Sequence, residues 1–236
     1  DSAGNIYRSE EFTSEYTDPT RSWIRRENDH IIVLLFGARE SLADDLFVSA
    51  ADAMTALEEA HGFTLDYKPY VVVMPDQASF QEWQEYPDPY LAGVTYYGMG
   101  YTIQTLQWGE QDLIESTVPH ELTHIFQYEI FFGGRRGRMI YARPPLWFME
   151  GMASYFGVHE DSRDEIYMRD ATLSDQVPSI MAAPQGFLAY RYGHKVFEYI
   201  EEEWGEDVVR DWVFGFRGNF GGQVGRPLRK VLNMDP

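Results

Sequence analysis

Two histidines four residues apart, His120 and His124, enclose a glutamate in the pattern His-Glu-x-x-His. Residues four apart lie on one face of a helix, so both imidazoles could bind one zinc ion. Glu121 is offset by one position, where its carboxylate could accept a proton from water at the metal without binding the metal itself. The chain has six histidines in 236 residues. Chance occurrence on a surface helix is therefore the alternative, and the surrounding sequence must decide.

The flanking residues predict the helix that this pattern requires. Ser116 and Thr117 are candidate N-caps, and Pro119 suits a first helical turn. Gly133 and Gly134 are typical of a helix end. Between these signals, apolar residues recur at helical spacing, namely Leu122, Ile125, Phe126 and Ile130. The context favours a metal-binding helix over coincidence.

A catalytic zinc ion takes three protein ligands and keeps one position open. The candidates for the third ligand include the acids and the other histidines, which are His30, His61, His159 and His194. We favour Glu150, because prolines introduce a nearly all-apolar segment over 144–156 that predicts a buried helix. An acid in such a helix needs a metal or a cation beside it. The alternative to a metal ligand is an ion pair with an arginine of 135–138 or with Arg143.

Together the two segments resemble the gluzincin metallopeptidases, the group that includes thermolysin and the large zinc aminopeptidases. The resemblance rests on His-Glu-x-x-His and on the Trp-Phe-x-Glu-Gly-x-Ala-x-Tyr-Phe segment around Glu150. The short step between the two motifs is most similar to the compact bacterial peptidase MA-like family. The likeness is strong over 112–158, weaker over 185–205, and only compositional before residue 90.

This resemblance implies a role for each motif residue. His120, His124 and Glu150 would be the zinc ligands, and Glu121 the general base and acid. Related proteins often carry an acid four residues after the glutamate ligand, where it orients a ligand histidine. Here that position is Ser154, so a serine, a backbone carbonyl or another acid would have to serve.

A further donor usually helps to stabilise the oxyanion that forms on the scissile carbonyl. The segment 187–197 resembles the Tyr-x-x-Gly helix of the compact family, with Tyr190 at the tyrosine position. Tyr190 is therefore the expected donor, and Tyr192 and His194 are the alternatives. A packing role is also open, because the chain has 16 tyrosines.

The remaining sequence must position these groups, and we expect an α+β, zincin-like fold. A small mixed or antiparallel sheet in the first half would pack on the His-Glu-x-x-His helix, and the second half would be helical. The predicted elements are a hairpin within 23–36, a helix from Ser41 to about Ala60, a strand over 70–74, a short helix over 76–84, two strands within 93–107, a linker over 160–183, and helices near 185–204, 206–216 and 226–233. In zincins an edge strand beside the metal pairs with the substrate, and we expect 102–106 to be that strand. An interior strand is the alternative.

We expect one domain over 1–236, with an N-terminal lobe over about 1–135 and a helical C-terminal lobe over 136–236. Asp1 is not a natural start, and no signal peptide opens the chain. Asp1 would then be a mature terminus or a cut end. The chain ends at 233–236 without a tail, which suits a domain cut from a longer protein in which a further domain could follow Pro236.

Composition excludes several function classes. The net charge of −19 and the pI near 4.6 argue against nucleic-acid or anionic-membrane partners. The absence of cysteine excludes disulfides and thiol chemistry. No apolar run reaches the roughly 18–20 residues of a membrane span. The arginines within 135–143 are expected to pair with the protein's own acids rather than with a substrate carboxylate.

The expected function is zinc-dependent hydrolysis of peptide bonds in a peptide or protein substrate. No free-amine anchor such as the Gly-x-Met-Glu-Asn motif of the aminopeptidases is present, and residues 98–101 only faintly resemble it. An endopeptidase is therefore favoured. The resemblance also implies an extracytoplasmic location, whether secreted, periplasmic or on the cell surface. One alternative is a non-catalytic binding or assembly module in which zinc only stabilises the fold. The other is a zinc hydrolase of a non-peptide amide or ester.

Overall fold

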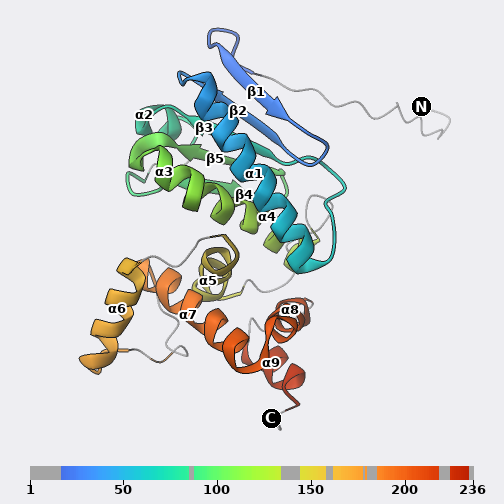
Figure 1. Ribbon diagram of the computed structural model, residues 1–236, viewed down its shortest axis with the longest axis vertical. Coiled ribbons are helices and arrows are strands. Elements are labelled where there is room, and N and C mark those ends of the chain that lie inside the picture. Colours follow the sequence, from blue (N-terminus) through green and yellow to red (C-terminus); the bar gives the residue numbers. More distant parts are fainter. Residues whose placement is uncertain are drawn as a thin grey trace, which may run out of the picture.

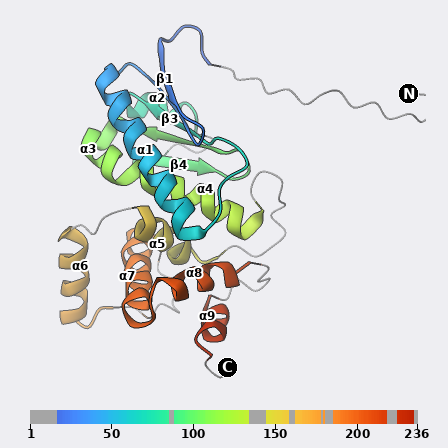
Figure 2. The same cartoon turned by 45° about the vertical axis from the view of Figure 1, so that its right-hand side comes forward.

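The computed structural model describes residues 17–84, 88–133, 144–157, 162–177, 179, 185–217 and 224–233. Within these residues it confirms a mixed α and β protein, with a small mixed sheet in the first half and helices in the second. The two parts lie one above the other in Figure 1, and the turned view in Figure 2 shows the same separation. The arginine-rich segment at 135–143 lies outside the described residues.

Over the described ranges the sheet has five strands, in the order β1-β2-β3-β5-β4. The strands are β1 (Trp23–Glu27), β2 (Ile32–Phe36), β3 (Tyr70–Met74), β4 (Gly93–Tyr96) and β5 (Tyr101–Thr105). Strands β1 and β2 pair antiparallel, which confirms the predicted hairpin. Strand β3 runs parallel to β2 and to β5, and β4 closes the sheet antiparallel to β5. The edges of the sheet are therefore β1 and β4.

The expectation that 102–106 forms the edge strand is wrong, and the alternative of an interior strand holds. Strand β5 pairs with β3 on one side and with β4 on the other. Its residues Thr102 to Thr105 are all buried, as is typical of a strand covered on both faces. A tight connection, with Gly98 and Gly100 at positive φ, turns β4 back onto β5. Thus β4 is the edge strand on this side of the sheet.

The helices mostly follow the predicted segments. They are α1 (Glu40–His61), α2 (Gln77–Gln81), η1 (Leu106–Trp108), α3 (Glu110–Asp112), η2 (Leu113–Thr117), α4 (Val118–Phe132), α5 (Leu146–Gly157), α6 (Ser162–Leu173), α7 (Phe187–Trp204), α8 (Glu206–Gly215) and α9 (Gly225–Val231). Helix α1 begins one residue before the expected start at Ser41, and Arg39 precedes it without a side-chain cap. The expected linker is wrong over the length of α6, which is helical. None of the described helices is both long enough and apolar enough to cross a bilayer.

Helix α4 contributes to two apolar cores, against both of which Phe63 and Phe156 also pack. Its first half, through Leu122, Ile125 and Phe126, packs with α1 and with one face of the sheet. Its second half, from Ile130 to Phe132, packs with α5, α7 and α8. Figure 1 shows α4 at the junction between the sheet and the lower helices. The predicted metal helix is therefore the element that the two parts of the molecule share.

His61, in the last turn of α1, lies in an aromatic environment near this junction. Its ring is 4.7 Å from the Phe156 ring and 5.7 Å from the Phe126 ring, measured between centroids. The side chain is buried, and neither ring nitrogen has a hydrogen-bond partner among the described residues. Burial therefore lowers the pKa of His61 from 6.5 to about 4.

Replacement of His61 by leucine will reduce the acid sensitivity of the fold. The folded protein resists protonation of His61, whereas the unfolded chain takes up this proton near pH 6.5. The contribution of His61 to stability is therefore complete above pH 6.5 and is lost as the pH falls toward about 4. That loss amounts to roughly 3 kcal/mol and should be missing from His61→Leu. Urea titrations at several pH values would measure it, and wild-type and variant profiles that stay parallel from pH 7 to 4 would contradict the prediction.

Candidate metal centre

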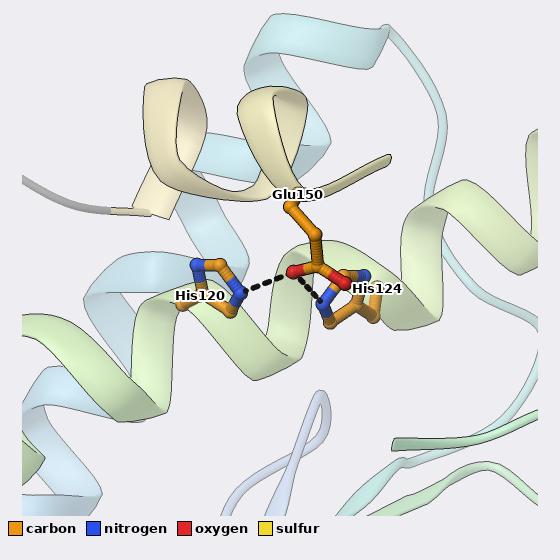
Figure 3. A group of neighbouring side chains, drawn as sticks. All are labelled: His120, His124 and Glu150. Atoms are coloured by element: carbon orange, nitrogen blue, oxygen red, sulfur yellow. Dashed lines mark hydrogen bonds and ion pairs between the residues drawn. The ribbon is translucent and has the colours of Figure 1, made fainter. Parts of the chain in front are cut away.

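Helices α4 and α5 bring His120, His124 and Glu150 to one point. The Oε2 atom of Glu150 lies 3.2 Å from His120 Nε2 and 3.4 Å from His124 Nε2. Figure 3 shows the carboxylate descending from α5 toward both rings, which lie one turn apart on α4. Each residue offers one ligand atom, and these three atoms lie within 4.8 Å of one another.

This donor set fits a zinc ion. Two imidazole nitrogens and a carboxylate oxygen are ligands that zinc commonly takes in catalytic sites. Tetrahedral ligands at about 2.0–2.1 Å from an ion lie roughly 3.3 Å from each other, which agrees with the separations of 3.2 and 3.4 Å. The three side chains are between 10% and 14% exposed, so the site is shielded but open to a cleft.

The charges at this point also suit a cation. Burial would raise the pKa of Glu150, but the attraction of His124 and hydrogen bonds from both imidazoles outweigh it, and the pKa lies below its usual range. Burial would likewise lower the pKa of His124, but the charge of Glu150 raises it to about 9. An ionised carboxylate between two basic nitrogens therefore favours positive charge here, which a proton or a metal ion could supply. The arginines proposed as partners of Glu150 lie outside the described residues.

Gln127 orients His124. The Nδ1 atom of His124 lies 2.8 Å from Gln127 Oε1, and Gln127 Nε2 donates to the carbonyl oxygen of Met149 at 2.7 Å. Because the amide nitrogen is committed to Met149, the amide oxygen accepts from the imidazole, and Nε2 of His124 is left for a metal. The sequence analysis missed this residue. Its place one helical turn after His124 is the signal that could have found it.

Ser154 is not the orienting group in this structure. It is buried and lines the cleft, but no hydrogen bond joins it to either ligand histidine among the described residues. The sequence analysis considered a serine, a backbone carbonyl or another acid as the group that orients a ligand histidine. For His124 the orienting group is instead the side-chain amide of Gln127.

Glu121 lies against the edge strand β4. Its side chain is 7% exposed, and Thr95 Oγ1 lies 2.6 Å from its Oε2 and 2.9 Å from its backbone oxygen. The hydroxyl has one proton, and the shorter separation favours donation to the carboxylate. A Cβ at Gly93 would lie 2.8 Å from the Glu121 carboxylate, so glycine is required for this close approach.

Tyr190 lies beside the metal group, and the two alternative donors do not. Its ring stacks on His120 with centroids 5.7 Å apart. Burial, the charges of Glu150 and Glu121, and a hydrogen bond to Glu150 all raise the pKa of Tyr190 above its ordinary range, so its hydroxyl keeps its proton. Tyr192 is buried, and His194 is 3.2 Å from Glu198. Neither lines the cavities around the metal group.

Two glycines set the distance between Tyr190 and Glu150. Gly151 directly follows Glu150 on α5, and Gly193 lies one turn after Tyr190 on α7. A Cβ at Gly193 would lie 2.0 Å from the carbonyl oxygen of Trp147 and 2.5 Å from the Cα of Gly151. The two helices therefore touch backbone to backbone beside the site.

The start of α4 differs from the prediction. Residues Leu113–Thr117 form a π-helical turn that runs directly into α4, and Thr117 has helical φ and ψ. Neither Ser116 nor Thr117 is therefore an N-cap, and the hydroxyl of Thr117 donates to the carbonyl oxygen of Asp112 instead. The end of the helix is as predicted, with Gly133 in the left-handed conformation.

Two cavities flank the metal group and together form a cleft. The first, which we call the His124-side cavity, has a volume of about 370 Å³. The second, the His120-side cavity, has a volume of about 490 Å³. Among the residues that the structure describes, those that line both are Leu91, Gly93, Glu121 and Tyr190. The side chain of Glu121 therefore lies where the two cavities of the cleft meet.

No protein-family model matches the sequence, and no curated protein matches it. Among solved structures, the fold is similar to the crystal structure of the M1 zinc metallopeptidase from Deinococcus radiodurans, with a TM-score of 0.51 and 14% sequence identity. The match covers 90% of this chain but only 48% of the other, so the chain spans about half the length of that peptidase. At this identity the likeness shows the fold alone. It does not reach the compact family.

Proposed function

We propose that this chain is a zinc-dependent peptidase. The observation that carries the proposal is the convergence of His120, His124 and Glu150 on one point, with the carboxylate of Glu121 held beside it and facing a cleft. Zinc bound by these three residues would lower the pKa of water and polarise a substrate carbonyl.

The protein's own groups then have distinct tasks. Glu121 is placed to accept a proton from water as it attacks the peptide carbonyl, and to pass that proton to the leaving amine. Thr95 holds the Glu121 carboxylate by a hydrogen bond. The protonated hydroxyl of Tyr190 can donate to the oxygen on which negative charge develops.

The edge strand β4 supports a peptide substrate over other amides and esters. The amide of Thr105 donates to the carbonyl oxygen of Ala92, so alternation along β4 directs the backbone groups of Gly93 and Thr95 away from β5. Tyr128 donates its hydroxyl to the Thr95 carbonyl at 3.2 Å. The N–H and C=O of Gly93 and the N–H of Thr95 can therefore pair with an extended peptide.

An enzyme is favoured over a non-catalytic module with structural zinc, because a structural zinc ion is bound by four protein ligands. Within the described ranges, only three potential ligands gather at this point. Endopeptidase action is favoured by the His124-side cavity, whose described lining holds no carboxylates except Glu121 and Glu150. A free amino terminus would find no further acid there.

Metal analysis combined with a peptide-library digest tests the proposal. The purified protein should hold close to one zinc ion per chain and should cleave peptides. Chelation should stop cleavage, and added zinc should restore it. Bound zinc with no cleavage of any peptide would favour the structural module, and failure to bind zinc would overturn the proposal.

Thr95→Val will lower the turnover number without loss of zinc. Valine keeps the shape of threonine but cannot hydrogen-bond to Glu121, so the carboxylate loses its fixed position. Misplacement of a catalytic group by about 1 Å can cost about 10²-fold in rate, and we expect a fall of about 10-fold or more in kcat with little change in KM. Thr95→Ser, which retains the hydroxyl, should recover most of the activity. Equal rates for the valine and serine variants would argue against this role.

A further inference from the structure

Only one lysine or arginine lines the cleft, within the part of the chain that the structure describes. It is Arg191, which follows Tyr190 on α7 and lines the His120-side cavity. The described lining of the His124-side cavity has neither lysine nor arginine. The chain carries 38 acidic side chains and only 19 lysines and arginines, so a guanidinium here makes this half of the cleft unlike most of the molecule. The two halves of the cleft therefore differ in charge.

The guanidinium of Arg191 is positioned by the ring of Phe187, which lies one helical turn earlier on α7. The Cζ atom of Arg191 lies 4.4 Å from the centroid of that ring, as in a cation–π contact. The Phe187 ring meets the ring of Tyr167 on α6 edge to face, with centroids 5.7 Å apart. A guanidinium stacks by its flat face and donates hydrogen bonds from its edge. Arg191 can therefore bind a carboxylate while it stays stacked on Phe187.

The start of α7 adds positive charge to the same cavity. Gly186, the residue before the helix, and Phe187, its first residue, both line the cavity. Among the described residues, no side chain caps this end of the 18-residue helix. The first N–H groups of a helix lack partners within the helix, and its N-terminus carries about half a positive charge. An anion in this cavity would therefore be favoured by the helix end as well as by the guanidinium.

Two carboxylates also line this cavity, and they oppose an acidic ligand. Asp88 Oδ1 accepts a hydrogen bond from the backbone N–H of Tyr90 at 2.9 Å, and this side chain is exposed to solvent, which screens its charge. Glu121 Oε2 accepts from the hydroxyl of Thr95 at 2.6 Å, and a zinc ion beside it would offset its charge. Neither acid therefore cancels the attraction of Arg191 for an anion.

We infer that Arg191 binds a carboxylate of the substrate next to the cleaved bond. This inference rests on the proposed function. The same cavity reaches Glu121 and Tyr190, so a group bound by Arg191 lies close to the reacting carbonyl. The cavity volume of about 490 Å³ accommodates an aspartate or glutamate side chain, and equally the carboxylate end of a peptide. Charge-assisted hydrogen bonds are roughly twice as strong as neutral ones, so an amide of the same shape should bind less well.

Two sets of peptides test the inference on the wild-type, zinc-loaded protein. The first set has blocked ends and carries glutamate or glutamine, and aspartate or asparagine, on either side of the cleaved bond. The second set ends one residue beyond that bond, with either a free or an amidated C-terminus. In one of the sets the acid should exceed its matched amide by about 10-fold or more in kcat/KM, and added salt should reduce the difference. The set that shows the difference identifies the source of the carboxylate as a side chain or as a chain end.

Variants of Arg191 locate the preference. Arg191→Gln should lower kcat/KM for the acidic peptide by about 10-fold or more and remove its advantage over the amide. Arg191→Lys, which keeps the charge but cannot bind a carboxylate through two nitrogens, should keep part of the advantage. Arg229→Gln makes the same change of charge on an exposed position of α9 outside the two cavities, and it should keep all of the advantage.

The outcomes separate this inference from the proposed function. Metal-dependent cleavage with equal kcat/KM for acid and amide in both sets would overturn the inference alone. A folded, zinc-loaded Arg191→Gln protein with the full wild-type advantage would also overturn it, and the peptide sets and the lysine variant decide the matter if the glutamine variant does not fold. Absence of metal-dependent cleavage of any peptide would overturn the proposed function and the inference with it.

Discussion

Replacement of Glu121 by glutamine will abolish peptide hydrolysis while zinc stays bound. Glutamine has nearly the same shape as glutamate, and its amide oxygen can still accept the hydrogen bond of Thr95. It cannot accept a proton from water at neutral pH. Loss of a general base typically lowers the rate by about 10²–10⁴-fold, and we expect kcat to fall within or beyond this range.

The measurement requires a control on the same stretch of chain. Glu115 lies before α4, hydrogen-bonds with Gln111 and does not line the cleft cavities. Glu115→Gln should retain wild-type kcat, and both variants should hold as much zinc as the wild-type protein. A Glu121→Gln protein with full zinc and more than a tenth of wild-type activity would show that another group carries the proton.

Gly193→Ala will destabilise the helical part and weaken the metal site. The added Cβ would lie 2.0 Å from the Trp147 carbonyl oxygen, so α7 and α5 must separate. Overpacking against side chains typically costs about 1–3 kcal/mol, and because the contact here is with backbone we expect at least about 3 kcal/mol. Glu150 and Tyr190 sit beside this crossing, so zinc affinity should fall as well.

Gly225→Ala provides the comparison, because a Cβ at Gly225 would meet no atom within 4 Å. Chemical denaturation and zinc titration of both variants would separate a steric effect at the crossing from a general effect of alanine. Similar free energies of unfolding for the two variants would mean that the helices adjust to the extra methyl group at little cost.

The local parts of the site could be predicted from sequence because they depend on helical periodicity. The spacing of His120 and His124 indicates a shared face, and a carboxylate in an apolar helix indicates that Glu150 needs a cationic partner. The structure brings these three side chains together. Helix periodicity extends over a few residues, so it carries this information without knowledge of the rest of the chain.

The supporting residues could not be predicted in this way, because their roles depend on contacts distant in sequence. Gln127 becomes significant only when the carbonyl of Met149 on α5 lies within reach. Thr95 becomes significant only because β4, and not β5, lies at the edge of the sheet beside α4. Alternation within a hairpin cannot reveal which of its strands pairs with a third strand.

Two other features gave no usable sequence signal. Gly151 and Gly193 stand in the two segments on which the family resemblance rests, but nothing in the sequence shows that these two glycines meet. Helix α6 leaves Ile166 and Leu173 exposed, so its apolar residues do not mark a buried face. A helix without such a face resembles a linker in sequence.

Helix α4 contributes side chains to both apolar cores, and this affects how the protein unfolds. The sheet side and the helical side bury largely separate sets of side chains, although Phe63 and Phe156 pack against both. An ion held by His120, His124 and Glu150 would bridge the two, and it would bind only while both are intact. The binding energy of such an ion would penalise every partly melted form, so the metal-loaded chain would melt as one cooperative unit. The ion proposed for the chemistry would thus also join the two halves of the protein.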